Sequence, residues 1–154
     1  MHPVRLATGE DVAELVRLRA VMFEAMGVTS SSPGWERSCR MFLEERLTDG
    51  RVIGFVVDAP DVSGLAACGL AELSSRIPSP ARAAGSQAYL SSFSTDPRWR
   101  RTGMGGAVLS HLLAELRALG VRRAELHATP DGARLYRLAG FQPRPGGLEM
   151  RLDF

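Results

Sequence analysis

Residues 95–109 read TDPRWRRTGMGGAVL, and the predicted fold depends on this segment more than on any other. It lies between an expected strand, residues 88–95, and an expected helix. The leucines of that helix recur at the spacing of one helix face: Leu109, Leu112, Leu113, Leu116 and Leu119. A helix that opens on glycine presents unpaired backbone N–H groups and the positive end of its dipole. The segment therefore predicts an anion site.

The side chains of the same segment favour a phosphorylated ligand. Three glycines without Cβ atoms let a phosphate approach the main chain closely, namely Gly103, Gly105 and Gly106. Three arginines in four positions add fixed positive charge, namely Arg98, Arg100 and Arg101. These arginines contact phosphates or form a solvated surface run, and the pattern leaves both readings open.

Three phosphate-binding motifs use such glycines, and their spacing separates them. A P-loop has Lys and then Ser or Thr after its last glycine, whereas Ala107 follows here, which excludes it. A dinucleotide-binding motif would use Gly103 and Gly105, but Val108 stands where its third small residue belongs. The third pattern, Arg-x-x-Gly-x-Gly, begins at Arg100 and is matched.

A second segment, LYRLAGF over residues 135–141, follows that match along the chain. Together the two segments resemble the acetyl-CoA site of the GNAT superfamily of N-acetyltransferases, in the family's order. The close resemblance covers residues 88–141, and upstream only the order of the elements is similar. The resemblance implies an α/β (α+β) GNAT fold: a central, mixed, mostly antiparallel twisted sheet of about six to seven strands with helices on both faces.

Local patterns predict the elements outside the central segment. The chain is expected to begin with a strand at 4–7, a helix opened by a Thr8/Asp11 capping box and ended by Gly27, and a second helix with Ser32 as N-cap and Pro33 as N1. Antiparallel strands at 51–58 and 63–73 follow, and then the strand at 88–95 and the glycine-opened helix to Gly120. The chain is expected to end with a strand at 122–127, a short helix capped by Asp131 and ended by Gly140, and a last strand at 147–154. The second helix is expected to turn Trp35, Cys39, Phe42, Leu43 and Leu47 inward. The loop at 74–85 borders an acceptor pocket or is a mobile surface loop.

Composition restricts the class of protein. The 154 residues suit a single domain, 1–154, with 45% apolar and 23% charged residues. A net charge of +2 does not favour a nucleic-acid partner, and all 19 basic residues are arginine. No apolar run is long enough for a membrane span and no signal peptide is recognisable, so we expect a cytoplasmic protein. Cys39 and Cys68 are expected to be reduced, buried thiols, without metal-like spacing.

The resemblance implies how acetyl-CoA binds as cosubstrate. The pyrophosphate would lie on backbone amides from Arg101 to Gly106, a run that includes Thr102, Gly103, Met104 and Gly105, with Arg100 beside it. The pantetheine arm would lie along Phe93, Ser94 and Thr95 like an added strand. Where the family often has Asn at the start of the last helix this chain has Thr129, which weakens one contact to the arm.

The implied reaction transfers acetyl from the thioester to a primary amine. An alkylammonium ion has a pKa near 10.4, so holding it neutral at pH 7 costs roughly 4.6 kcal/mol. Glu72 is the first candidate base and Glu24 the second, while an apolar pocket that lowers the amine's pKa is the alternative. Tyr136 matches the family tyrosine that donates a hydrogen bond to the departing thiolate. The backbone N–H of Phe93 or Ser94 would hold the thioester oxygen, and His127 is expected to be structural.

The sequence thus predicts an acyltransferase that acts by direct attack in a ternary complex, with no metal and no covalent intermediate. The rival hypothesis is a CoA-binding sensor or scaffold of the same fold without turnover. The acceptor, a small molecule or a peptide, is not readable from the chain, and neither is the range of acyl chains. The resemblance leaves room for a homodimer formed through the last strands.

Overall fold

The structure is a computed structural model that describes residues 2–28, 32–82, 84–144, 146, 148 and 150–154. Its elements in chain order are β1 (Arg5–Leu6), η1 (Gly9–Asp11), α1 (Val12–Ala25), α2 (Trp35–Asp49), β2 (Val52–Asp58), β3 (Leu65–Ser75), β4 (Ser86–Thr95), η2 (Pro97–Trp99), α3 (Met104–Ala118), β5 (Arg123–Glu125) and α4 (Ala133–Leu138).

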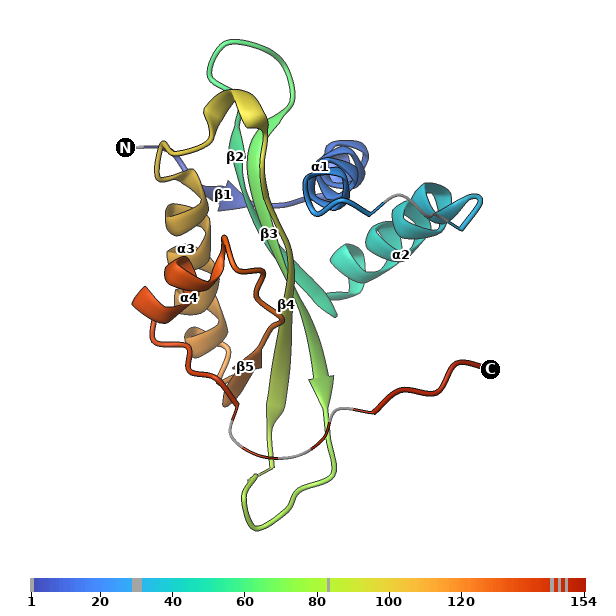
Figure 1. Cartoon of the computed structure of the whole chain (residues 1–154), viewed down its shortest axis with the longest axis vertical. Helices are drawn as coiled ribbons and strands as arrows, with labels where there is room; N and C mark the ends of the chain where they lie inside the picture. The colour runs from blue at the N-terminus through green and yellow to red at the C-terminus, as the bar shows by residue number, and fades with distance from the viewer. Residues whose placement is uncertain (1, 29–31, 83, 145, 147, 149) are drawn as a thin grey trace.

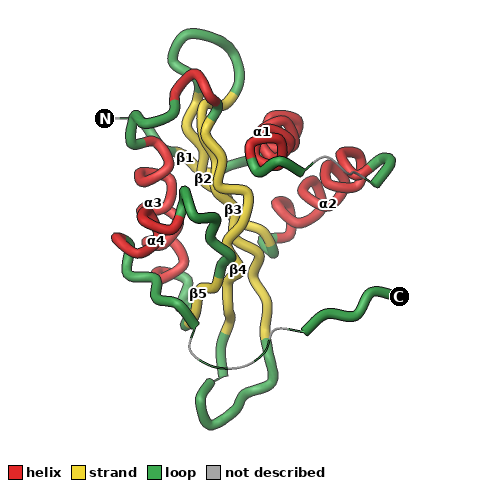
Figure 2. Tube along the Cα trace, viewed as in Figure 1, coloured by secondary structure: helices red, strands yellow, loops and turns green. Residues whose placement is uncertain are grey.

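The strands form one mixed sheet in the order β1-β2-β3-β4-β5. Strands β1 to β4 pair antiparallel, and β5 pairs parallel with β4. Figure 1 shows the sheet between two helical layers, with α1 and α2 on one side and α3 and α4 on the other; Figure 2 shows the same division by element type. This confirms the predicted α/β fold, with five strands in the described residues.

Each face of the sheet has its own apolar core because successive strand residues point to opposite faces. Strand β2 sends Val52 and Val56 towards α1 and α2, and Phe55 and Val57 towards α3. The buried side chains of α3 include Leu109, Leu112 and Leu116. The predicted apolar face of α3 is thus confirmed up to its last position, where Leu119 is exposed.

Two of the four predicted helix starts needed correction. The Thr8/Asp11 capping box is confirmed, and it opens the 3-10 turn that leads into α1. Ser32 is not the N-cap of α2, because the helix begins at Trp35 after Gly34, whose φ is 77°. The carbonyl of Ser32 instead accepts from the Trp35 N–H at 3.2 Å, which makes a turn before the helix.

The inward face of α2 is narrower than predicted. Leu43 is buried, while Trp35, Cys39 and Leu47 are half-buried. Phe42 is 37% exposed, with the Arg46 guanidinium stacked on its ring. Phe42 therefore covers the outside of the helix rather than the core.

The cap of α4 is also not the predicted one. Asp131 makes no cap bond, and the helix begins after Gly132. The Thr129 hydroxyl accepts from the Gly132 N–H at 3.3 Å, and the Thr129 carbonyl accepts from the N–H groups of Gly132 and Ala133. The turn closes two residues earlier than expected, so Thr129 takes the role given to Asp131.

The predicted last strand is absent from the described part of residues 147–154, and positions 147 and 149 lie outside the described residues. Four apolar side chains that alternate along this segment are exposed, namely Leu148, Met150, Leu152 and Phe154. Alternation makes a segment suited to a strand, but a strand also needs a partner edge with which to pair. Here the segment runs away from β5 (Figure 1).

Two further expectations concern membranes and thiols. Among the described residues, every helix is too short or too polar to cross a bilayer. Both cysteines are free: Cys68 is buried as predicted, and Cys39 is half-buried. Burial raises the pKa of the Cys68 thiol to about 12, so this group stays protonated near neutral pH.

Candidate active site

Strand β4 carries a bulge at the middle of the sheet. Cys68 of β3 pairs with Ser94 and Leu70 pairs with Ser91, so β4 has one residue more than β3 between these pairs. The extra residue is accommodated at Ser92, whose φ of 56° is rare outside glycine. A ring carbon of Phe93 would lie 2.5 Å from a Cβ placed on Gly69, so the missing side chain at Gly69 makes room for the Phe93 ring. The bulge thus re-aims the predicted cofactor-binding residues.

Beyond its first residues, β4 has an open edge. Its pairing with β5 joins only Gln87, Ala88 and Tyr89 to residues 123–125. From Leu90 to Thr95, no strand in the described part of the chain pairs with the side of β4 away from β3. Main-chain groups along such an edge are available to an extended ligand that adds like a strand. Phe93, Ser94 and Thr95 lie on this segment.

The glycine segment forms a tight turn between η2 and α3. Arg101 and Gly103 have positive φ values of 65° and 86°. The Thr102 hydroxyl donates to the carbonyl of Trp99 at 2.5 Å, and Arg100 Nε donates to the carbonyl of Thr95 at 3.2 Å. These bonds tie the turn to the end of β4.

Within the described residues, no side chain caps the first turn of α3, which begins at Met104 after Gly103. A Cβ placed on Gly103 would meet no atom within 4 Å, so the space in front of it is open. A Cβ on Gly105 would lie 3.8 Å from Thr95 Oγ1 and one on Gly106 3.6 Å from Leu135. The turn, the end of β4 and α4 therefore meet at one place. The Met104 side chain is buried in the core, which leaves only its backbone to a ligand.

The buried carboxylate of Asp96 stabilises this turn through ion pairs. Asp96 accepts from Arg98 Nε at 3.0 Å and from Arg17 of α1 at 2.9 Å, and its side chain is 6% exposed. Hydrogen bonds from Arg98 hold the pKa of Asp96 well below its usual range. Arg98 also stacks on the Trp99 ring. Arg98 is thus paired within the turn, and all three arginines, Arg98, Arg100 and Arg101, are exposed at its surface.

Tyr136 lies on α4 between two aromatic rings. Its ring centroid is 5.9 Å from that of Phe93 and 6.0 Å from that of Phe141, both at edge-to-face angles. Burial raises the pKa of the Tyr136 hydroxyl, so it remains a proton donor at neutral pH. The contact with Phe93 places Tyr136 beside the bulge of β4.

Glu72, the first candidate base, is on the opposite face of the sheet from Tyr136. It alternates along β3 with Cys68 and Leu70, which pack towards α1, and it pairs directly with Tyr89 of β4. Glu72 is half-buried. Glu24, the second candidate, is exposed on α1.

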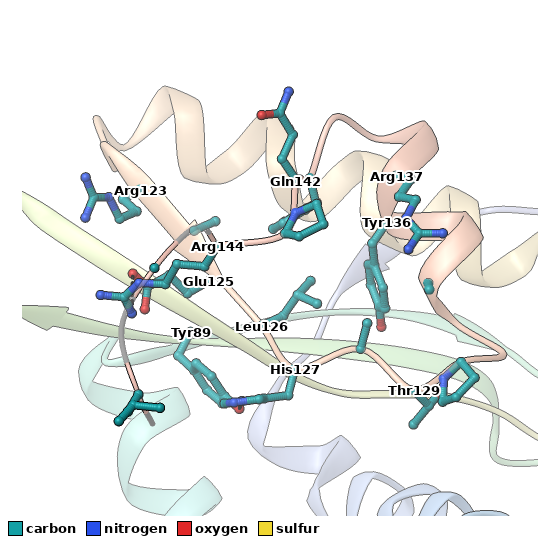
Figure 3. A pocket seen from close by; sticks show the side chains of 18 residues that line it. Tyr89, Arg123, Glu125, Leu126, His127, Thr129, Tyr136, Arg137, Gln142 and Arg144 are labelled. Atoms are coloured by element: carbon teal, nitrogen blue, oxygen red, sulfur yellow. Dashed lines mark hydrogen bonds and ion pairs between the residues drawn. The ribbon is translucent and has the colours of Figure 1, made fainter. Parts of the chain in front are cut away.

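A cleft of about 1050 Å³ lies beyond β4 and is lined from both sides of the sheet. Tyr136 of α4 and Phe141, three residues beyond the end of that helix, line the cleft. Tyr89 of β4, Glu125 of β5 and His127, two residues beyond β5, line it as well (Figure 3). Arg144 approaches Glu125 at 4.0 Å. Tyr136 is thus the one predicted catalytic residue that lines this cleft, and Glu72 does not.

Sequence reasoning missed the pair formed by Tyr89 and His127. The Tyr89 hydroxyl and His127 Nδ1 are 2.8 Å apart, and Figure 3 shows the two side chains side by side below Tyr136. His127 follows Glu125 by two residues, so a strand at this place puts both on one face. The two-residue spacing of Glu125 and His127 is the sequence feature that could have pointed to His127. His127 is exposed, and its imidazole lies in the cleft beside the phenol of Tyr89.

The comparisons agree with this geometry. A sequence model of the acetyltransferase (GNAT) family matches residues 15–141, and the chain belongs to that family. It is therefore an acyltransferase, and the family's reaction uses acetyl-CoA as cosubstrate. No curated protein matches the chain in sequence.

Solved structures with low sequence identity share the fold over nearly their whole length. A predicted acetyltransferase with acetyl-CoA from Clostridium acetobutylicum is 19% identical, with a TM-score of 0.86 over 98% of this chain and 96% of the other. A GCN5-related N-acetyltransferase from Ralstonia eutropha JMP134 is 24% identical, with a TM-score of 0.80 over 98% and 99%. Glucosamine-6-phosphate N-acetyltransferase from Arabidopsis thaliana is 15% identical, with a TM-score of 0.75 over 99% of each chain.

Proposed function

We propose that this protein transfers acetyl from acetyl-CoA to a primary amine of a small molecule or peptide, by direct attack in a ternary complex. The observation that carries the proposal is the meeting of three features at one end of β4: the uncapped glycine turn, the open strand edge and the Tyr136 hydroxyl. A ligand with a phosphate group, an extended amide arm and a reactive end would match the turn, the strand edge and the tyrosine in turn.

The turn would bind the pyrophosphate through its main chain. Backbone N–H groups from Arg101 to Gly106 would donate to it, because the first N–H groups of a helix lack an intrahelical partner and the N-cap of α3 makes no side-chain cap bond. The helix dipole also favours negative charge there. The exposed side chains of Arg100 and Arg101 add positive charge close to the turn. From the turn, the pantetheine arm would follow the free edge of β4 at Phe93, Ser94 and Thr95.

The bulge would place the thioester. Because β4 gains a residue at Ser92, its regular ladder with β3 is interrupted at this place. We infer that the N–H of Phe93 or Ser94 donates to the thioester oxygen and stabilises the oxyanion that forms on attack. The Tyr136 hydroxyl would donate a hydrogen bond to the departing thiolate. Full proton transfer is uphill by about 1.5 pKa units between a tyrosine and a thiol.

The attacking amine must lose a proton, and two groups on the face of Tyr89 can receive it. Glu72 is directly opposite Tyr89 in the sheet, and His127 is hydrogen-bonded to the Tyr89 hydroxyl. We propose Glu72 as the base, acting directly or through ordered water, with Glu24 as the second candidate. His127 is the competing base that the structure adds.

The test is thiol release from acetyl-CoA by the purified protein with a panel of amino acids, aminoglycosides, polyamines and peptide N-termini. Turnover with at least one amine, together with the acetylated product by mass spectrometry, would support the proposal. Tight CoA binding without turnover of any amine would favour a CoA-binding sensor instead. Failure to bind CoA would contradict both.

A further inference from the structure

Arg19 of α1 reaches the bulge of β4 from the face opposite Tyr136. Its Nη1 donates to the Ser92 hydroxyl, and its guanidinium lies 4.9 Å from the centroid of the Phe23 ring. Phe23 in turn packs edge-to-face on Trp35 of α2, with 5.8 Å between ring centroids. Arg19 is half-buried. A cation is thus held in a defined position by a hydroxyl and an aromatic face.

In the described part of the chain, this guanidinium has no carboxylate within ion-pair distance. Arg17, two residues earlier on α1, differs in this respect. Arg17 is bound by Glu14 at 2.6 Å and by Asp96 at 2.9 Å. A half-buried arginine that lacks such a counter-ion retains its capacity to bind an anion.

Arg19 also lies close to the proposed site of reaction. It bonds to Ser92, and the next residue, Phe93, contacts Tyr136. Consecutive Cα atoms are about 3.8 Å apart, so Arg19 and Tyr136 reach adjacent positions of one strand from opposite faces. An acceptor that approaches the thioester from the α1 face would pass the guanidinium.

Further along the same face the charge changes sign. Glu72, Tyr89 and Glu125 pair across β3, β4 and β5 in one row, so their side chains share a face. Glu72 is two residues beyond Leu70, which pairs with Ser91 beside the bulge. At about 3.3 Å per residue, the backbone of Glu72 lies roughly 7 Å along β3 from that pair. An ammonium group is favoured at one end of this face and an anion at the other.

We propose that Arg19 binds an anionic group of the acceptor, a carboxylate or a phosphate ester, and that the acceptor is a small amine that carries both charges. The inference rests on the proposed acetyl transfer and names the class of its acceptor. Polyamines, which are positive throughout, are repelled by Arg19. Neutral amines lose the contact that orients them.

The first experiment compares amines that differ in one anionic group: β-alanine with propylamine, and phosphoethanolamine with ethanolamine. We expect kcat/KM to be about 10-fold or more higher for the anionic member of a preferred pair, mostly through KM. In Arg19→Gln the ratio within the pair should fall towards 1, and Arg19→Lys should restore part of it. A ratio unchanged in Arg19→Gln would overturn the proposal. Arg40→Gln, at an exposed arginine of α2, is the matched control and should keep the ratio.

A purely structural role for Arg19 gives a different result. If Arg19 only stabilises the bulge through Ser92, its replacement should lower kcat/KM for both amines of a pair by the same factor. It should also raise the KM for acetyl-CoA. The ratio within the pair therefore separates anion recognition from support of the strand. The two pairs also distinguish a carboxylate site from a phosphate site.

A binding experiment does not depend on turnover. Titration of ¹⁵N-labelled protein, saturated with CoA, with acetate and with inorganic phosphate should produce saturable shifts of the Ser92 and Phe93 amides with one of the two anions. These shifts should be lost in Arg19→Gln and kept in Arg40→Gln. Absence of saturable shifts with both anions in the unaltered protein would overturn the inference. Shifts at Ser92 in a protein that turns over no amine would support the anion site while rejecting the transferase proposal.

Discussion

Replacement of Gly103 by glutamate should separate ligand binding from folding. Gly103 has a φ of 86°, and a side chain there would meet no atom within 4 Å. The left-handed conformation costs a residue with a Cβ about 1–2 kcal/mol, which would lower the melting temperature by about 2–8 °C. The protein should therefore still fold.

The expected loss of CoA binding is much larger. A carboxylate roughly 5 Å from a phosphate charge, at an effective dielectric constant of about 20, is repelled by about 3.3 kcal/mol. That energy corresponds to a roughly 250-fold weaker Kd for each phosphate charge at this distance. Gly103→Ala adds only a methyl group and should weaken binding far less.

Gly120, at the other end of α3, provides a matched control. Its φ is 76°, and a side chain there would also meet no atom within 4 Å. The helix dipole favours a glutamate at the start of α3 and disfavours one at its end, so Gly120→Glu should be the less stable variant. Calorimetric titration with CoA should nevertheless show weak binding only in Gly103→Glu. Equal affinity in both variants would contradict a phosphate site at this turn.

Three other variants test the remaining roles. Tyr136→Phe should lower kcat about 10- to 100-fold while the Kd for CoA stays the same, since a hydrogen bond to the thiolate is lost; an unchanged kcat would remove Tyr136 from the mechanism. Glu72→Gln should lower kcat at pH 7 by about 100-fold, and the rate of this variant should rise as the pH approaches the pKa of the amine. If His127→Asn shows this pH dependence and Glu72→Gln does not, the base is His127. Because the ion pairs of Asp96 depress its pKa, the stability they contribute is present above about pH 4 and is lost as the pH falls through the folded-state value. Asp96→Asn should lower the free energy of unfolding by about 3 kcal/mol at pH 7, and urea titrations should show this gap narrowing towards pH 2; a gap independent of pH would argue against the ion pairs as its source.

Features that depend on neighbouring residues were predictable. The Thr8/Asp11 capping box, the antiparallel pairing of β2 with β3, and the glycine turn before α3 are all confirmed. Each is specified by residues within a few positions of one another, through hydrogen bonds and periodicity that act locally. Predictions of this kind failed where two local solutions compete, as at Ser32 and Asp131.

Features that join distant parts of the chain were not predictable. The last strand was expected from its alternating apolar residues, but pairing depends on an edge elsewhere in the sheet. Glu72 was chosen by its residue type and its place near a strand end. Only the register of β3 and β4 decides that it shares a face with Tyr89 rather than with Tyr136.

The amino-acid sequence alone determined the family's two motifs, the glycine turn and the position of Tyr136 on a short helix, because these are properties of contiguous residues. Tertiary structure decided which side chains meet. Arg19 reaches Ser92 across 73 positions, and Tyr89 meets His127 across 38. Such contacts depend on the bulge in β4 and on the packing of α1 against the sheet. No local pattern encodes them, since strand register and helix packing are set by the whole core at once.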